Sequence, residues 1–159
     1  MRCPNKLKVF LELFIPLYGG GARFRVCLRL REFFRIHKMT FGAICIKSYL
    51  QKRYGCELSI NAKISPKAEF MHTVGVIIGE GVVVSAGVKL YGNLTLGRKD
   101  VFDEDAYPYI CENVILSTGC TVLGKVVVGE RAAIGAQSLV IKNVEPDSVY
   151  VGSPAKRIK

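Results

Sequence analysis

Aliphatic side chains recur at every sixth position from residue 60 onward. The series runs through Ile60, Pro66, His72, Ile78, Val84, Leu90 and Leu96, and resumes as Ile110, Leu116, Val122, Val128, Ile134, Val140 and Pro146. A second, mostly apolar series follows four residues after each of these positions. Neither the helical period of 3.6 nor the strand period of 2 produces this pattern. A period of six predicts a solenoid of hexapeptide repeats, in which short strands wind into triangular coils around an aliphatic interior.

His72 is the member of this series with the most bearing on function. An imidazole at an aliphatic, inward-facing position is costly unless it is hydrogen-bonded. The period places His72 in the interior of the solenoid, where a hydrogen-bonded structural histidine, in the core or at the corner of a coil, is the first interpretation of this residue alone. A functional histidine is the alternative interpretation.

One segment, RKDVFDEDAYPY at 98–109, interrupts the repeat. An insertion in a solenoid projects from one face, where it often forms part of a functional site. The segment contains Asp103, Asp105 and Tyr107 among its acidic and aromatic residues. Carboxylates accept hydrogen bonds from hydroxyl groups, and tyrosine rings pack against sugar rings. A solvated acidic loop without a ligand explains the same composition.

Residues 1–55 have the periodicity of helices. The segment 22–38 predicts a helix with one apolar stripe and with arginines largely opposite: Val26, Cys27, Leu30, Phe33 and Phe34. The segment 41–55 predicts a second helix, which ends before Gly55, with a stripe of its own: Phe41, Ile44, Cys45 and Tyr49.

The arginine-rich helix allows two interpretations. It packs against the solenoid or a partner, as most amphipathic helices do, or it lies on a membrane surface as a peripheral contact. The apolar run before it is interrupted by Glu12 and Pro16 and is too short to span a bilayer. We therefore expect a cytoplasmic protein, at the inner face of the membrane if the helix binds lipid.

The formal net charge of +10 indicates an anionic partner, such as lipid or a phosphate-bearing cofactor. Nucleic acid is not expected, because the chain has no module of basic and aromatic residues. The six cysteines form no CxxC pair, and the chain has only two histidines. We therefore expect reduced thiols and no metal site.

Four segments resemble motifs of a known enzyme family. HTVGVIIG (72–79), LTLGR (94–98), DAYPYI (105–110) and VGSPAKRI (151–158) are similar, in this order, to HATGIVIG, VTLGG, DRHPKI and AGVPARIV of serine acetyltransferases. The chain thus resembles the hexapeptide-repeat acyltransferases, in their serine O-acetyltransferase-like and polysaccharide O-acetyltransferase branch.

The resemblance implies a mainly β fold, a left-handed parallel β-helix shaped as a triangular prism. The expected organisation is an N-terminal helical segment at residues 1–55 and a β-helix acyltransferase domain at residues 56–159, from which the loop 98–109 is extruded. It further implies a homotrimer with active sites between neighbouring subunits.

The resemblance also implies transfer of an acetyl group from acetyl-CoA, the co-substrate, to a hydroxyl group, without a metal. His72 matches the family's general base, which takes the proton of the acceptor hydroxyl. Glu57 stands where the family has an aspartate that orients this imidazole. An ordinary solvated carboxylate is the alternative for Glu57.

Seven further residues match positions that bind acetyl-CoA in the family. They are Thr118, Gly119, Ala136 and Gln137 along the pantetheine groove, and Lys142, Lys156 and Arg157 near the phosphates. Small residues let the pantetheine arm approach the backbone, and lysine and arginine bind phosphate. Surface charge that only keeps the protein soluble explains each of the three cations equally well.

The sequence departs from serine acetyltransferases at the acceptor. Met71 replaces an aspartate that often precedes the catalytic histidine, and Ala106 and Tyr107 replace an Arg-His pair of the loop that holds the amino acid. We therefore expect a hydroxyl of a sugar or surface-polysaccharide precursor as acceptor, bound by Asp103, Asp105 and Tyr107. L-Serine, the acceptor in cysteine biosynthesis, is the alternative. A non-catalytic trimeric scaffold is a second alternative.

Overall fold

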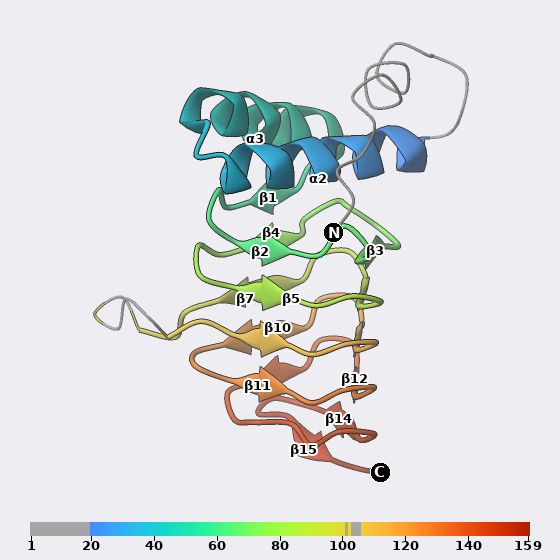
Figure 1. Cartoon of the computed structure of the whole chain (residues 1–159). Coiled ribbons are helices and arrows are strands. Elements are labelled where there is room, and N and C mark those ends of the chain that lie inside the picture. The colour runs from blue at the N-terminus through green and yellow to red at the C-terminus, as the bar shows by residue number, and fades with distance from the viewer. Residues whose placement is uncertain (1–19, 101, 103–105) are drawn as a thin grey trace.

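The computed structural model of the 159-residue chain describes residues 20–100, 102 and 106–159, with only the backbone for residues 20–22. Two helices, α2 (Gly20–Ile36) and α3 (Thr40–Tyr54), precede a stack of short strands. The helices lie across the N-terminal end of this stack, and the C-terminus lies at the opposite end (Figure 1).

The strands form three sheets around one core. Sheet A contains β1 (Glu57–Leu58), β4 (Ile77–Ile78), β7 (Thr95–Gly97), β10 (Thr121–Leu123) and β13 (Leu139–Val140). Sheet B contains β2 (Lys63–Ile64), β5 (Val83–Val84), β8 (Tyr109–Ile110) and β11 (Val127–Val128). Sheet C contains β3 (Glu69–Phe70), β6 (Lys89–Leu90), β9 (Ile115–Leu116), β12 (Ala133–Ile134), β14 (Val149–Val151) and β15 (Lys156–Arg157).

The chain visits sheets A, B and C in turn, so each coil has three sides. The pairings between coils are parallel, and β15 returns antiparallel to β14 at the C-terminal end. The solenoid predicted from the period of six is confirmed.

Each coil places one aliphatic side chain per strand in the interior. In the second coil these are Ile78, Val84 and Leu90, all at most 1% exposed. Full burial of such a side chain stabilises a fold by about 1.5–3 kcal/mol relative to exposure. A single coil could not achieve it, because the coils above and below supply most of the covering atoms.

The first coil has a different register from the later ones. Ile78 pairs with Leu96, eighteen positions further on, whereas Leu58 pairs with Ile78 across twenty positions. The two extra residues lie between β3 and β4, which are joined by residues 71–76, six residues in place of the four that join β6 to β7. The inward positions of the first coil are therefore Leu58, Ile64 and Phe70.

The prediction that His72 occupies an interior position is therefore wrong. The His72 side chain is exposed, and so is Pro66 in the same series. Counting back by sixes from Ile78 crosses the longer turn, so the count misses the inward positions of the first coil by two residues. His72 lies in the turn itself.

The two helices begin and end close to the predicted positions, but their predicted stripes are only partly buried. Gly55 follows α3 in the left-handed conformation, with φ of 63°, and its N–H binds the Gln51 carbonyl at 3.1 Å. The predicted α3 stripe is wrong, because Phe41, Ile44, Cys45 and Tyr49 are all exposed. The buried residues of α3 are Ala43 and Leu50 instead. None of the described helices is long and apolar enough to cross a bilayer.

The α2 helix packs against the first coil through Phe24, Leu28 and Arg31, all nearly fully buried. Arg31 was not anticipated, because it is a charged residue on a buried face. In the stack, N–H groups of one coil bind carbonyls of the next, as in Lys63 N–H to the Val82 carbonyl at 2.9 Å. The strand carbonyls of the first coil therefore have no preceding coil whose N–H groups could donate to them.

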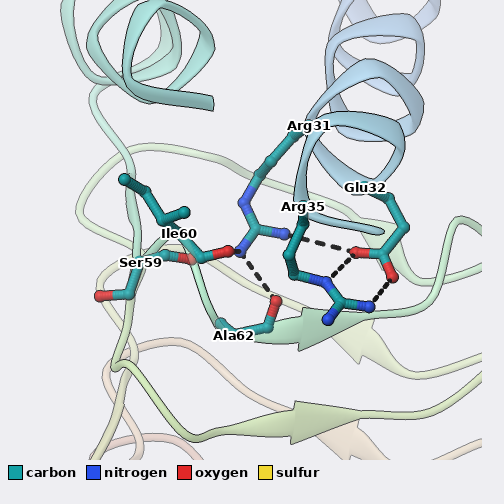
Figure 2. Close-up of polar contacts among 6 residues, drawn as sticks. All are labelled: Arg31, Glu32, Arg35, Ser59, Ile60 and Ala62. Atoms are coloured by element: carbon teal, nitrogen blue, oxygen red, sulfur yellow. Dashed lines mark hydrogen bonds and ion pairs between the residues drawn. The ribbon is translucent and has the colours of Figure 1, made fainter. Parts of the chain in front are cut away.

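The Arg31 guanidinium binds three of these carbonyls (Figure 2). Its Nη2 donates to the Ala62 carbonyl at 2.8 Å, and also to the Ser59 and Ile60 carbonyls. Burial lowers the pKa of Arg31 to about 10, so the group stays protonated at neutral pH. Arg31 thus ties α2 to the open end of the prism.

Arg31→Met is expected to lower the free energy of unfolding by about 2 kcal/mol or more, because buried carbonyls lose their donor. Arg35→Met is the matched control, since within the described part of the chain the Arg35 side chain binds Glu32 alone, in a partly exposed pair, and its loss should cost less than about 1 kcal/mol. Urea unfolding monitored by circular dichroism measures both. Equal destabilisation by the two substitutions would contradict the role assigned to Arg31.

Candidate active site

Three edges run along the prism where neighbouring sheets meet. The histidine edge joins sheet C to sheet A and contains residues 71–76, 91–94, 117–120 and 135–138. The loop edge joins sheet A to sheet B and contains the insertion between β7 and β8. The third edge joins sheet B to sheet C and contains residues 111–114. The described part of the insertion projects from the stack at one side (Figure 1).

His72 lies at the N-terminal end of the histidine edge. One coil below it, Gly92 leaves room for the histidine, since a Cβ at Gly92 would lie 3.4 Å from His72 Cβ. The neighbouring ring is Tyr91, edge-on to the imidazole with 6.0 Å between ring centroids. Sequence analysis missed Tyr91. Its position in the turn that follows the His72 turn along the same edge is the signal that could have identified it.

A groove of about 1010 Å³ opens beside His72. It runs from the turn that holds His72 across β3 to the third edge, where Glu112 and Asn113 line it. The α2 helix borders it with Phe24, Arg25 and Leu28. An exposed imidazole at the border of a groove can exchange protons with a bound molecule, which an interior imidazole could not do.

Glu57 is not bonded to His72 in the described residues. Its carboxylate pairs with Lys47, at 3.5 Å between Oε1 and Nζ. The backbone does bring the two segments side by side, because Gly75 N–H binds the Gly55 carbonyl at 2.8 Å and Glu57 N–H binds the Val76 carbonyl at 2.8 Å. An orienting role for Glu57 therefore stays a prediction, and it requires the carboxylate to turn from Lys47 toward His72.

The four residues predicted to bind pantetheine lie together on the histidine edge. Gln137 N–H binds the Thr118 carbonyl at 3.0 Å, so the two turns stack directly. Gly119 has φ of 72°, and a Cβ there would lie 2.7 Å from Cδ of Gln137. With Ala136, these residues form a narrow strip of small side chains and backbone, two and three coils below His72.

The three predicted phosphate-binding cations do not gather at that strip. Lys142 follows β13 on the loop edge, and Lys156 and Arg157 form β15 at the C-terminal end of sheet C. Arg157 is paired with Glu145, and its Nε donates to the Lys159 carbonyl at 2.9 Å. Their contact with phosphate stays a prediction.

On the loop edge, Asp103 and Asp105 lie outside the described residues. Ala106 is buried, and the half-buried ring of Tyr107 packs over Gly79 and Gly81. A Cβ added at Gly79 would lie 3.3 Å from Tyr107 Cε1. Tyr107 thus anchors the end of the insertion to the prism, a function that sequence analysis missed; its role in acceptor binding stays a prediction.

The cysteines and acidic residues of the described part supply no metal site. No group of three or more His, Cys, Asp or Glu side chains there could hold an ion. The described cysteines are free thiols, and burial raises the pKa of Cys56 to about 11 and that of Cys120 to about 12.

Solved structures share this architecture. A serine acetyltransferase in complex with CoA aligns with a TM-score of 0.81 and 26% identity, covering 89% of this chain and 58% of that one. Serine acetyltransferase from Vibrio cholerae aligns with a TM-score of 0.81 and 28% identity, covering 89% and 55%. The fold is therefore the left-handed parallel β-helix of the hexapeptide-repeat acyltransferases.

Proteins with similar sequences show which family of acyltransferases the chain belongs to. The Helicobacter pylori serine acetyltransferase (strain 26695) is 31% identical over 154 residues, covering 97% of this chain and 86% of the relative. A putative serine acetyltransferase of Schizosaccharomyces pombe is 36% identical over 117 residues, covering 74% and 43%. No family model matches the chain. The chain belongs to the serine acetyltransferase family. It spans less than half the length of the fission-yeast relative and of a Buchnera relative.

Gly81→Ala is expected to displace the Tyr107 ring and loosen the insertion, because the new Cβ would overlap the ring. Gly97→Ala is the matched control, since a Cβ there meets nothing nearer than Leu123 at 3.9 Å. Limited proteolysis should cut the segment 98–108 faster in the Gly81 variant only. Equal cleavage of both variants would show that Tyr107 does not anchor this segment.

Proposed function

We propose that the protein is a serine O-acetyltransferase, which transfers the acetyl group of acetyl-CoA to the hydroxyl of L-serine. The observation that carries this proposal is the exposed His72, placed by its longer turn beside a groove and on the edge that holds the strip of small residues. The family membership supports serine as acceptor. The sugar or surface-polysaccharide hydroxyl inferred from the loop has no support among the relatives described above.

The chemistry assigned to His72 is general base catalysis. A serine hydroxyl is a weak nucleophile at neutral pH, so the imidazole takes its proton as the oxygen attacks the thioester carbonyl carbon. The C–S bond then breaks, and the imidazolium returns the proton to the sulfur leaving group. The products are O-acetylserine and CoA, and His72 ends the cycle in its starting state.

The histidine edge suits a thin, extended co-substrate. Thr118, Gly119 and Ala136 leave backbone accessible, where the amide groups of a pantetheine arm would find hydrogen-bond partners. The strip continues upward past Gly92 to His72. A CoA molecule along this edge would bring its sulfur end to the imidazole.

The arrangement of the edges supports a homotrimer with shared sites. The histidine edge and the loop edge of one chain are separated by the width of sheet A. A second prism that places its loop edge against the first histidine edge would complete the site, and three copies close under threefold symmetry. This assembly would use the projecting insertion as the cover over a neighbour's His72.

His72→Ala is expected to lower kcat at least about a hundredfold, the lower range for loss of a general base. CoA binding and the unfolding midpoint should stay unchanged, because the side chain is exposed. His37→Ala alters the other histidine of the sequence, which is also exposed, and should retain full activity. Glu57→Gln should lose less than His72→Ala. Turnover above about a tenth of the wild-type value in His72→Ala would refute the general base.

The shared site predicts rescue between two inactive variants. One carries His72→Ala, and the other has the insertion 98–108 shortened. When they are unfolded together and refolded at equal amounts, about a quarter of the interfaces combine an intact histidine with an intact loop. Activity should therefore return to about a quarter of the wild-type level. If sedimentation confirms trimers and the mixtures stay inactive, the whole site lies within one chain. If sedimentation shows a stable monomer, the proposed trimer is wrong.

A further inference from the structure

The groove beside His72 is lined by charges of both signs. Arg25 and Lys67 contribute cations, and Glu69 and Glu112 contribute carboxylates. All four side chains are exposed. Within the described part of the chain, neither the Arg25 guanidinium nor the Lys67 ammonium forms a hydrogen bond or ion pair. This pattern of unpaired cations and nearby carboxylates is complementary to a small zwitterion.

The acceptor proposed above has a carboxylate that needs such a cation. At the base of the insertion, the described residues Ala106 and Tyr107 offer none, because alanine is apolar and buried and the tyrosine ring packs over glycines. The residue before the histidine, Met71, is also uncharged and lines the same groove. Arg98 and Lys99 at the start of the insertion are exposed cations, but they do not line the groove beside His72, whereas Arg25 and Lys67 do.

We propose that Arg25 binds the carboxylate of the acceptor amino acid in the groove beside His72. This inference rests on the proposed function and names the residue that selects an amino acid over a simple alcohol. A guanidinium binds a carboxylate through two parallel hydrogen bonds, which fixes orientation as well as charge. Glu69 and Glu112 provide the opposite charge for the ammonium group.

The position of Arg25 is well defined by its surroundings. Phe24 and Leu28, on either side of it in α2, are 3% and 4% exposed and line the same groove. The helix is also fixed to the first coil through Arg31. A long side chain on a rigid helix at the groove border can reach a ligand without rearrangement of the backbone.

The test compares two acceptors in wild type and Arg25→Met. L-Serine and 2-amino-1,3-propanediol share the ammonium and hydroxymethyl groups, but only serine has the carboxylate. Arg25→Met should lower kcat/KM for serine by about tenfold or more, through KM, which corresponds to loss of a charge-assisted hydrogen bond. It should leave kcat/KM for the diol within about twofold, and leave KM for acetyl-CoA unchanged, because the diol offers no carboxylate to bind.

Two variants serve as controls. Lys63→Met removes one positive charge from an exposed strand position outside the groove and should change neither acceptor. Arg25→Lys keeps the charge without the planar fork and should fall between wild type and Arg25→Met for serine. Unfolding midpoints should be equal for all variants, since Arg25 and Lys63 are exposed.

The outcomes separate the inference from the function it rests on. If wild type acetylates serine but Arg25→Met leaves serine unaffected, or impairs both acceptors equally, Arg25 does not bind the carboxylate. If Arg98→Met, in the exposed insertion, produces the serine-specific loss instead, the cation comes from the loop and the inference is overturned. If wild type acetylates other hydroxyl compounds and not serine, the proposed function fails and the inference fails with it.

Discussion

The backbone hydrogen bonds between successive coils are the interaction on which the rest of the structure depends. In the strands, N–H groups of one coil bind carbonyls of the next coil, for example Glu57 N–H to the Val76 carbonyl and Ile77 N–H to the Leu94 carbonyl. This ladder requires strands of two or three residues in strict register, and the aliphatic period of six follows from it. It also leaves a row of carbonyls without donors at the N-terminal end. The helices and Arg31 close that end, so a residue that looks like surface charge is part of the core.

The same ladder explains how a turn between strands can be lengthened. A turn between strands is free to lengthen as long as the strands on both sides keep their partners. Leu58 and Ile78 remain paired although two extra residues separate them, and Phe70 and Leu90 remain paired in the same way. The extra length moves His72 out of the hydrophobic interior to the surface of the histidine edge. The insertion between β7 and β8 uses the same freedom on the loop edge.

The sequence predicted the features that repeat and missed those that occur once. The coils, the interruption at 98–109 and the helix end at Gly55 follow from local patterns, because each depends on nearby residues. The register of the first coil could not be read by counting, since Pro66 and His72 fit the count of six without facing inward. Pro66 and His72 are two neighbouring exceptions in an otherwise aliphatic series, and they were the available signal that the register changes in the first coil. Arg31 and the exposed face of α3 depend on contacts between distant segments, which no local pattern reports. Motif resemblance singled out His72 for a reason different from its place in the period, and the four residues that it matched to pantetheine binding lie on the same edge.

A crystal structure of the protein with CoA would test most directly the central claim, that the longer turn places His72 at the reacting end of the co-substrate. The account predicts pantetheine along the strip at residues 118–119 and 136–137, with the sulfur beside the His72 imidazole and a second subunit covering the groove. CoA bound on another edge or on the face of a sheet, with its sulfur remote from His72, would contradict it.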